Sequence, residues 1–512
     1  MSETSQDLRP DVTDRQTSLD VDPEAFAAVG HKLVDDIAAL LASMRERPVT
    51  SNATPEGVRA ALPADRRLPE EGAELGDLVG STFETLVPHS TYNGHPRFFG
   101  YITGSPAPAG MLADFLGAAL NPNMGAWSLS PMASEIEAQA VRWVAELVGF
   151  PAGGDGIFVS GGNVANMLGF WAARAAKADW DVRGEGMRAE SGGVLRAYVP
   201  RGTHTWIEKA ADLSGLGTES IRWVETDREG RVDLAALETA IEADAAAGDR
   251  PFMVVGTAGS VSTGVIDPLP ALRALCDRHG LWFHVDGAYG AFAAAAPNAP
   301  DDLRGLALAD SVALDPHKWL YAPAEVGCTL VRDPAALSRA FSYRPDYYRF
   351  DGGGHNYFER GIQNSRGFRA LKVWMQLRQA GAAGYRRMIA EDIELALRFH
   401  AIADEHAELQ ALTHSLSITT YRFVPADLAR RLDEPHVGAY LNELNRQIQD
   451  RMERDGRAFV SHAVLDGVHA LRMCIVNFRT TLEDVQALAE ISVELGREVD
   501  GQLRSRLPRH AA

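Results

Sequence analysis

The sequence has little cysteine. Its three cysteines, Cys276, Cys328 and Cys474, are widely spaced among 512 residues, which excludes a disulfide framework or a zinc ribbon and favours a reducing compartment. Long hydrophobic runs are also missing, because the alanine-rich run 290–296 is far shorter than the roughly 20 apolar residues of a membrane helix. Residues 1–22 are polar and lack the apolar core of a signal peptide. We therefore expect a cytoplasmic protein without a membrane span.

Basic residues are fewer than acidic residues in this chain. The chain carries 50 Lys and Arg against 69 Asp and Glu, a formal net charge of −19. Sequence-independent nucleic-acid binding needs a basic footprint, and so does attraction to an anionic membrane surface. We therefore expect neither nucleic acid nor membrane as a partner, and we predict no metal site. Hydrophobic residues at 46% and charged residues at 23% are typical of a globular protein, and the length predicts two or three domains.

The pattern along the chain predicts four regions. Residues 1–22 are expected to be disordered, and residues 23–104 to form a helical segment with little core of its own, which packs on a partner subunit. In residues 105–385 short β-rich runs alternate with helical stretches, which predicts an α/β domain with a mostly parallel sheet and helices on both faces. Residues 386–512 are expected to form a small α+β domain.

Three motifs follow predicted strands of this sheet. The first, Ser-Gly-Gly-Asn at 160–163, lies at a strand-to-helix turn, where glycines and free helix N–H groups can cradle a phosphate. The second begins at Asp286, at the end of the apolar run 281–285, and small residues after it leave room for a flat ring. The third contains Lys318, after the strand 311–314, where a desolvated amine can attack a carbonyl group.

Each motif alone has an ordinary structural explanation: a tight turn, a helix N-cap and a surface lysine. Together they supply what pyridoxal phosphate requires. Lysine bonds to the aldehyde of this cofactor, an acid pairs with its pyridine nitrogen, and the glycine turn holds its phosphate. The combination therefore predicts a pyridoxal-phosphate enzyme.

The sequence resembles the group II pyridoxal-phosphate-dependent amino-acid decarboxylases, the family of aromatic L-amino-acid decarboxylase. The most specific motif is Asp-Pro-His-Lys-Trp at 315–319. Further family landmarks are His-Pro-Arg-Phe-Phe-Gly at 95–100 and Phe-Arg-Ala-Leu-Lys-Val-Trp at 368–374. The resemblance extends from about Pro23 to the C-terminal helices. It implies the fold-type I (aspartate-aminotransferase-like) architecture and a homodimer in which the N-terminal segment packs on the partner.

The resemblance implies a role for each matching residue. Lys318 bonds to the cofactor, Asp286 faces the pyridine nitrogen and His204 stacks on the ring. The remaining residues expected to bind the cofactor are Thr257, Ala288, Gly161, Gly162, Asn163 and Asp315. Tyr357, beside the glycines 352–354 of a possible lid, is expected to protonate the substrate carbon, with His317 nearby and Tyr347 and Tyr348 as further candidates.

Two positions depart from the family pattern. Asn163 stands where members often carry serine, and an amide can still donate a hydrogen bond. Asp315 stands where animal aromatic decarboxylases carry asparagine, and a carboxylate repels a nearby phosphate unless a cation intervenes. The role of Asp315 is therefore open.

The implied activity is decarboxylation of an L-amino acid to its amine and CO2, with an aromatic substrate (Trp, Tyr, Phe or Dopa) favoured. Substrates with an acidic side chain (glutamate, aspartate or cysteine sulfinate) are the alternative. An aldehyde synthase, an aminotransferase or a desulfhydrase of the same fold also stays open, and so does a binding protein with a decayed site. The expected substrate pocket, built partly by the partner subunit, comprises Phe98, Tyr101, Thr103, Asn123, Gly125 and Trp127.

Overall fold

The computed structural model describes residues 17–62, 67–187, 193–344 and 353–506. The chain divides into two compact units, Met1–Tyr92 and Asn93–Ala512. None of the described helices is long and apolar enough to cross a lipid bilayer. Of the region predicted to be disordered, residues 1–16 lie outside the described residues.

The first unit is helical, as the spacing of its apolar residues predicts. Its helices are α1 (Pro23–Ala42), α2 (Pro55–Ala61) and α3 (Leu75–Leu86). The carboxylate of Asp22 caps α1 by accepting from the N–H groups of Glu24 and Ala25, and a proline at the first turn fits the helix start. No residue of α1 or α3 is buried. This unit therefore leaves apolar side chains exposed.

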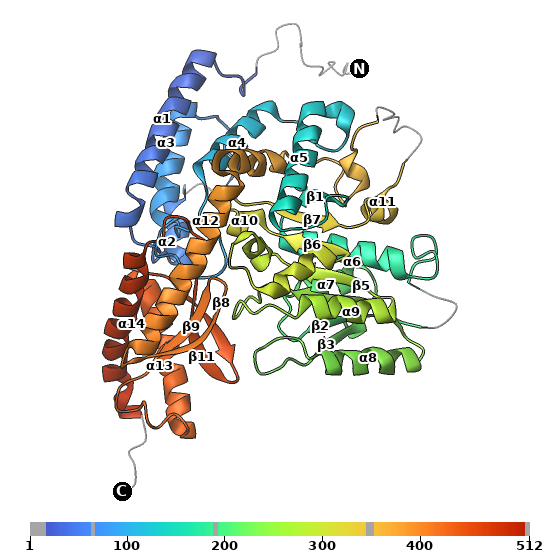
Figure 1. Ribbon diagram of the computed structural model, residues 1–512. Helices are drawn as coiled ribbons and strands as arrows, with labels where there is room; N and C mark the ends of the chain where they lie inside the picture. The colour runs from blue at the N-terminus through green and yellow to red at the C-terminus, as the bar shows by residue number, and fades with distance from the viewer. Residues whose placement is uncertain (1–16, 63–66, 188–192, 345–352, 507–512) are drawn as a thin grey trace, which may run out of the picture. The chain divides into compact units, whose positions relative to one another are not determined.

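A seven-stranded sheet forms the centre of the second unit (Figure 1). Its order is β1-β7-β6-β5-β4-β2-β3. Strand β7 pairs antiparallel with both β1 and β6, and the other pairs are parallel, which confirms the mostly parallel sheet predicted from the sequence. The strands are β1 (Asp155–Val159), β2 (Leu195–Pro200), β3 (Ile221–Val224), β4 (Arg250–Thr257), β5 (Trp282–Asp286), β6 (Ser311–Leu314) and β7 (Gly327–Val331).

Helices cover both faces of this sheet, because successive strand residues point to opposite sides. On β4, Met253 and Val255 join the core beneath α6 (Gly162–Lys177) and α7 (Trp206–Leu213). Val254 joins the opposite core, with side chains of other helices. Those helices include α5 (Pro131–Leu147), α8 (Leu234–Ala246) and α9 (Leu269–His279). Shorter or peripheral helices are α4 (Pro108–Leu120), α10 (Pro316–Trp319) and α11 (Ala336–Phe341).

The C-terminal part contains a smaller antiparallel sheet with helices α13 (Pro435–Asp455) and α14 (Leu482–Leu503) (Figure 1). Its order is β10-β11-β9-β8, with strands β8 (Leu409–Ser415), β9 (Ile418–Phe423), β10 (Ser461–Leu465) and β11 (Val468–Cys474). The long element α12 (Arg369–Glu405) connects the two sheets and is interrupted at Gly381, whose φ is 63°. Because α12 crosses residue 385, the domain boundaries expected there stay a prediction.

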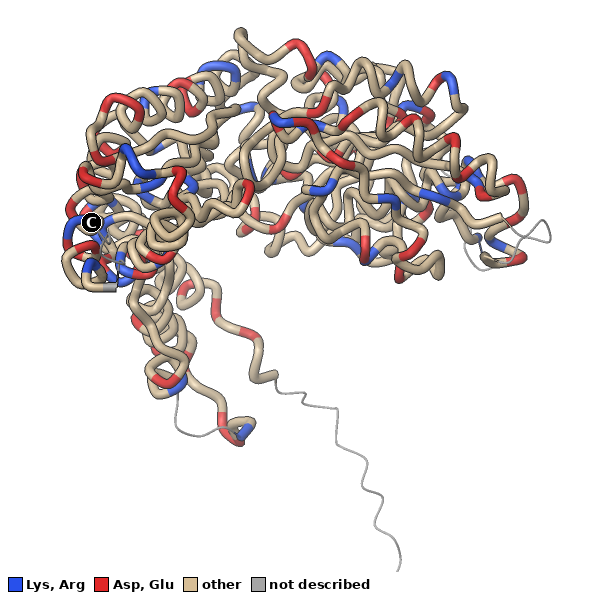
Figure 2. The backbone as a smooth tube through the Cα atoms, turned by 90° about the horizontal axis from the view of Figure 1, so that it is seen from below, with Lys and Arg blue, Asp and Glu red and all other residues tan. Residues whose placement is uncertain are grey.

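Basic and acidic residues are interspersed along the described backbone (Figure 2). Many form ion pairs within a helix, such as Lys32 with Asp36 and Arg446 with Asp450. Such exposed pairs contribute little to stability, at most about 1 kcal/mol each. The charge pattern is therefore that of a solvated surface.

Candidate active site

The carboxyl ends of five strands meet at one edge of the large sheet and surround a cavity of about 350 Å³. Parallel strands place the residues that follow them at the same edge, which is where open α/β sheets bind ligands. Every residue predicted to bind the cofactor lines this cavity, namely Gly161, Gly162, Asn163, His204, Thr257, Asp286, Ala288, Asp315 and Lys318. His317 lines it too. Motifs far apart in sequence therefore form one site.

Lys318 lies in the short helix α10, directly after β6, and pairs with Asp315. Its Nζ is 3.0 Å from Asp315 Oδ2, and the carboxylate is almost fully buried. Asp315 Oδ1 has no hydrogen-bond partner among the described residues. A buried carboxylate is costly without a cation. The lysine ammonium therefore supplies the charge that Asp315 needs in the cofactor-free protein.

The glycine turn faces Asp315 at close range. A Cβ atom on Gly162 would come within 2.5 Å of Asp315 Oδ2, so a larger residue would have to displace that carboxylate. Helix α6 starts at Gly162, and its first backbone bond runs from the Ala165 N–H to the Gly161 carbonyl. The N–H groups of residues 162–164 therefore precede the helical ladder and carry the positive end of the helix dipole.

Asp286 ends β5 and is held from two sides. The indole Nε1 of Trp206 donates to Asp286 Oδ2 over 2.8 Å, and the Ala288 N–H donates to Oδ1 over 3.2 Å. Trp206 is completely buried at the start of α7. These two hydrogen bonds fix the orientation of the carboxylate. An acid so held suits a cationic ring nitrogen.

Two histidines line the cavity in different settings. Burial lowers the pKa of His204, so the imidazole is neutral near pH 7 and presents an uncharged ring. His317 Nδ1 lies 2.8 Å from the Val326 carbonyl oxygen. When Nδ1 donates to that carbonyl, Nε2 is left as the nitrogen that exchanges a proton.

The donor set fits pyridoxal phosphate. A lysine amine, a fixed carboxylate and the N–H groups at a helix start converge on one cavity, and the small Gly162 keeps the turn open. The carboxylate of Asp315, beside the glycine turn, is at odds with a phosphate, and in this structure Lys318 compensates its charge. The residues therefore match the group that the sequence predicts.

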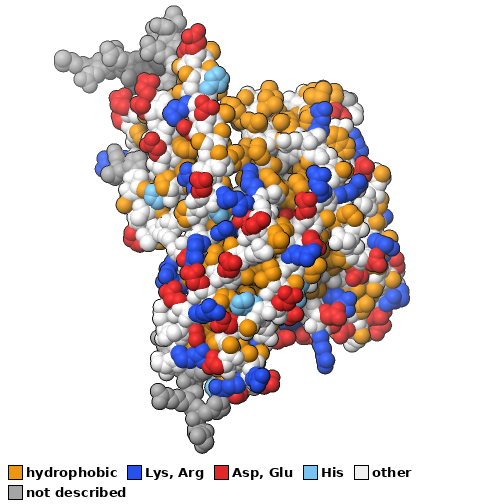
Figure 3. Space-filling view, turned by 60° about the vertical axis from the view of Figure 1, so that its left-hand side comes forward, with side chains coloured by type: hydrophobic (Ala, Val, Ile, Leu, Met, Phe, Trp, Pro, Cys, Tyr) orange, Lys and Arg blue, Asp and Glu red, His pale blue; other side chains and the backbone are white. Residues whose placement is uncertain are grey.

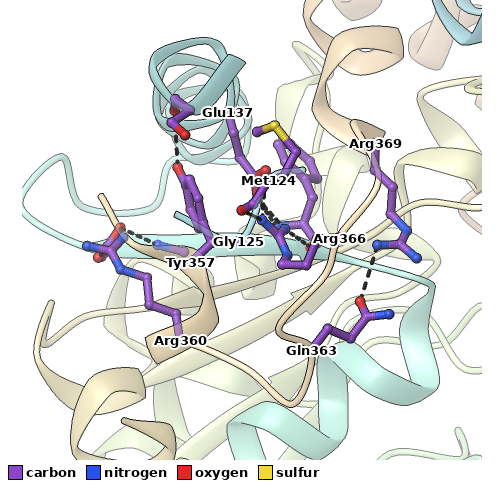
Figure 4. Close-up of polar contacts among 12 residues, drawn as sticks. Met124, Gly125, Glu137, Tyr357, Arg360, Gln363, Arg366 and Arg369 are labelled. Carbon is purple, nitrogen blue, oxygen red and sulfur yellow. Dashed lines mark hydrogen bonds and ion pairs between the residues drawn. The ribbon is translucent and has the colours of Figure 1, made fainter. Parts of the chain in front are cut away.

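Tyr357 does not reach the cavity. Its hydroxyl donates to the Ser134 carbonyl of α5 over 3.4 Å, and Figure 4 shows it pointing at that helix. The guanidinium groups of Arg360 and Arg366 lie 5.5 and 4.8 Å from the ring centroid. The residue is 1% exposed, and burial raises its pKa well above the usual value. Its proton-donor role stays a prediction that this position does not favour.

The other loop tyrosines named as alternatives, Tyr347 and Tyr348, lie outside the described residues, as does Gly352 of the possible lid.

The residues expected to form the substrate pocket do not line the cavity within this chain. They are Phe98, Tyr101, Thr103, Asn123, Gly125 and Trp127. Phe98 stacks on Phe459 with ring centroids 5.2 Å apart, and Tyr101 is 63% exposed. The roles of these six residues stay predictions.

Residues 123–127 are instead bonded to the segment that follows the possible lid. The Phe358 N–H donates to the Gly125 carbonyl over 3.0 Å. A second backbone bond, also of 3.0 Å, runs from the Met124 N–H to the Arg366 carbonyl. The expected pocket residues of this stretch therefore lie beside the expected proton donor, away from the cavity.

A buried ion pair reinforces this arrangement (Figure 4). Arg366 Nη2 lies 2.6 Å from Glu137 Oε1 of α5, and both side chains are 1% exposed. The same guanidinium donates from Nη1 to the Met124 carbonyl over 3.1 Å. Breaking a buried pair from one side is costly, because it leaves an uncompensated charge. The pair therefore fixes residues 123–127 against α5.

Sequence reasoning missed Trp206 and Asn166 of the cavity wall. Trp206 fixes Asp286, and Asn166 lies one helical turn after Gly162 with its side chain bonded to the Gly162 carbonyl. The spacing of four residues was a usable signal for Asn166, because positions i and i+4 share a helix face. For Trp206 only its closeness in sequence to His204 pointed to the site.

Comparison with known proteins agrees with this geometry. Residues 55–421 match the conserved domain of the pyridoxal-dependent decarboxylases. An aromatic-L-amino-acid decarboxylase of Bacillus atrophaeus is 31% identical, over 92% of this chain and 97% of its own. A phenylacetaldehyde synthase of Petunia hybrida is 30% identical, over 90% and 92%. The crystal structure of Oryza sativa TDC with PLP and tryptamine shares 26% identity and a TM-score of 0.86, covering 94% of this chain and 99% of that one.

The fold and the cavity define a fold-type I pyridoxal-phosphate enzyme. The chain belongs to the pyridoxal-dependent decarboxylase family, as the match over most of its length shows.

Proposed function

We propose that this decarboxylase converts an aromatic L-amino acid to its amine and CO2. The observation that carries the proposal is the convergence of Lys318, Asp286 and the glycine turn on one cavity. Relatives named for aromatic substrates or products support the substrate class.

Each residue contributes one physical task. Bound pyridoxal phosphate supplies the electron sink for the bond that breaks to release CO2. Lys318 would hold the cofactor through its amine. Asp286, fixed by Trp206, keeps a proton on the ring nitrogen, and the neutral His204 offers a flat surface for the ring. The N–H groups at the start of α6 bind the phosphate.

His317 is our candidate for the proton donor to the substrate carbon. It lines the cavity beside Lys318, whereas the Tyr357 hydroxyl is bonded to α5. Its contact with the Val326 carbonyl orients the ring and leaves Nε2 able to carry the transferred proton. The proposal therefore assigns general-acid catalysis to the residue next to the lysine.

A panel of amino acids tests the substrate class. We expect CO2 and the matching amine from at least one of Trp, Tyr, Phe and Dopa, and much slower release from glutamate, aspartate and cysteine sulfinate. Fastest release from an acidic substrate would refute the aromatic assignment while leaving the decarboxylase chemistry intact.

An aldehyde synthase is the second candidate, because the Petunia hybrida relative is named as one. Such an enzyme consumes oxygen and gives aldehyde, ammonia and peroxide with CO2, whereas a decarboxylase gives the amine. Measuring amine, aldehyde and peroxide from the same reaction under air separates the two. We expect amine as the main product.

We also propose a homodimer. Figure 3 shows hydrophobic side chains gathered on the upper part of one face, at the height of α4 in Figure 1. Helix α4, in the second unit, exposes four large apolar side chains. They are Leu112, Phe115, Leu116 and Leu120, each about half exposed or more. In the first unit α1 exposes Phe26 and Val34. A second copy can cover such surfaces symmetrically.

Sedimentation tests this proposal. We expect a dimer at micromolar concentration and a monomer after Leu116→Asp, with Leu213→Asp as a control at an exposed leucine of α7. An active monomeric wild type would contradict it.

We further infer a cytoplasmic location, because all three cysteines are buried free thiols.

A further inference from the structure

A series of buried hydrogen bonds runs behind the cavity, from β5 and β6 to the first turn of α6. Trp282 Nε1 donates to Ser311 Oγ over 2.8 Å, and Ser311 Oγ lies 2.7 Å from His284 Nδ1. His284 Nε2 lies 2.8 Å from Asn166 Oδ1. Asn166 Nδ2 then donates to the Gly162 carbonyl over 2.9 Å. The series therefore ends on the glycine turn.

Its two ends fix the direction of every bond. The Gly162 carbonyl can only accept, so Asn166 presents its nitrogen there and its oxygen to His284. His284 must then carry its proton on Nε2, and its Nδ1 accepts from the Ser311 hydroxyl. Ser311 still accepts from Trp282, which can only donate. One neutral tautomer of His284 thus satisfies all these groups.

The surroundings of His284 favour that neutral form. The side chain is fully buried, and burial lowers its pKa to about 4. Gly169 of α6 makes the room for it, because a Cβ there would come within 2.6 Å of His284 Cε1. The imidazole also packs edge-on against Trp206, with centroids 5.6 Å apart, and Trp206 donates to Asp286. His284 therefore contacts the supports of both the glycine turn and the acid.

Anchoring the Gly162 carbonyl has a direct effect on the next residue. That carbonyl and the Asn163 N–H belong to one planar peptide unit and point in opposite directions. Fixing the oxygen toward Asn166 inside α6 therefore fixes the Asn163 N–H toward the start of the helix, where the cavity lies.

We infer that His284 and Asn166 are positioning residues for the cofactor phosphate: through the Gly162 carbonyl they hold the N–H groups of the glycine turn in a binding-competent orientation. The inference rests on the proposed role of residues 161–163 in phosphate binding. Neither residue transfers a proton in the reaction. Their contribution is the alignment of donors before the cofactor arrives.

Binding of two cofactor forms to the cofactor-free protein tests this. Pyridoxal phosphate carries the phosphate, whereas pyridoxal lacks it and can still reach Lys318. Asn166→Leu keeps the shape of the side chain but removes its bonds to His284 and to the Gly162 carbonyl. For this variant we expect pyridoxal phosphate to bind about tenfold more weakly, which is the effect of losing one hydrogen bond to the phosphate. Pyridoxal should bind as in wild type. His284→Phe should behave in the same way.

Two further variants serve as controls. His284→Gln should recover most of the affinity, because its amide can donate to Asn166 Oδ1. Trp282→Phe should change little, because Ser311 still donates to His284 without the indole. If Asn166→Leu does not fold, the comparison of His284→Phe with His284→Gln decides the question.

The inference is overturned if the variants weaken pyridoxal as much as pyridoxal phosphate, or if they weaken neither. Failure of the phosphate assignment itself has another signature. Gly162→Ala would force the Asp315 carboxylate to move. If that variant retains the wild-type preference for pyridoxal phosphate over pyridoxal, the turn does not bind the phosphate, whatever His284 and Asn166 do.

Discussion

The residues expected to bind the cofactor (the cofactor half) and those expected to contact the substrate (the substrate half) differ in one respect. A single chain brings the first group together at one cavity but not the second. The predicted cofactor residues line one cavity at the strand ends, whereas Tyr357 and the six expected substrate-pocket residues lie elsewhere. The cofactor residues follow strands of a rigid sheet, so the sheet itself brings them together. The expected substrate residues belong to connecting segments, which contact α5 and the C-terminal part instead. The proposed homodimer would then supply the rest of the substrate pocket.

Removing the lysine has the largest expected effect on this comparison. Lys318→Ala deletes the amine that bonds to the cofactor, so we expect the loss of both turnover and the visible absorbance of the bound cofactor. Absorbance spectra and CO2 release measured on the same preparation check this. Lys372→Ala is a suitable control, because Lys372 pairs with Asp114 outside the cavity. Wild-type turnover without Lys318 would remove the basis of the cofactor half.

Substitution of the two candidate proton donors, His317 and Tyr357, should have the second-largest effect. His317 lines the cavity and Tyr357 does not, so we expect His317→Gln to slow amine formation by about 10²–10⁴-fold, the usual contribution of a positioned acid. Tyr357→Phe removes only a hydroxyl bonded to Ser134 and should have a much smaller effect on the rate. Initial rates of amine formation check both. The reverse order of effects would return the role to Tyr357 and imply that its segment moves.

The buried His284 behind the cofactor cavity should make the stability of the protein depend on pH. The pKa of His284 is lowered by burial to about 4, so below pH 6.5 the unfolded chain takes up a proton that the folded one refuses. The free energy of unfolding should therefore decrease as the pH is lowered. Between pH 7.5 and pH 5 this group should account for a decrease of about 2 kcal/mol. Urea unfolding of cofactor-free wild type and His284→Gln checks this. Equal pH slopes in the two proteins would contradict it.

The smallest expected effect concerns Asp315, whose charge Lys318 compensates. Asp315→Asn removes a carboxylate next to the glycine turn and leaves an amide that can donate. We expect pyridoxal phosphate to bind about tenfold more tightly and pyridoxal to bind as before, since one unit charge nearby is worth a few kcal/mol before solvent screening. Weaker binding of both forms would show that the carboxylate supports Lys318 instead.

The sequence could predict for a physical reason that the expected cofactor residues lie at one edge of the sheet. Apolar runs such as 311–314 identify the strands, and parallel strands converge at their carboxyl ends, so Asp286 and Lys318 could be placed together without coordinates. Asn166 and Trp206 were missed because their role depends on side-chain bonds across elements.

The substrate half was less predictable because its segments lack periodicity. Nothing in the glycine-rich stretch before Tyr357 indicated that its ring would be buried between two arginines. The edge strand β3 (Ile221–Val224) was also missed, since four residues give too short a pattern.

Trapping the cofactor on the chain tests the central claim most directly. Borohydride reduces the C=N bond between a lysine and the cofactor aldehyde to a stable amine, and peptide mass spectrometry then locates the modified residue. We predict modification at Lys318, one cofactor per chain, and no modification in Lys318→Ala. Modification at another lysine of the wild-type protein, or none after loading with pyridoxal phosphate, would contradict the account.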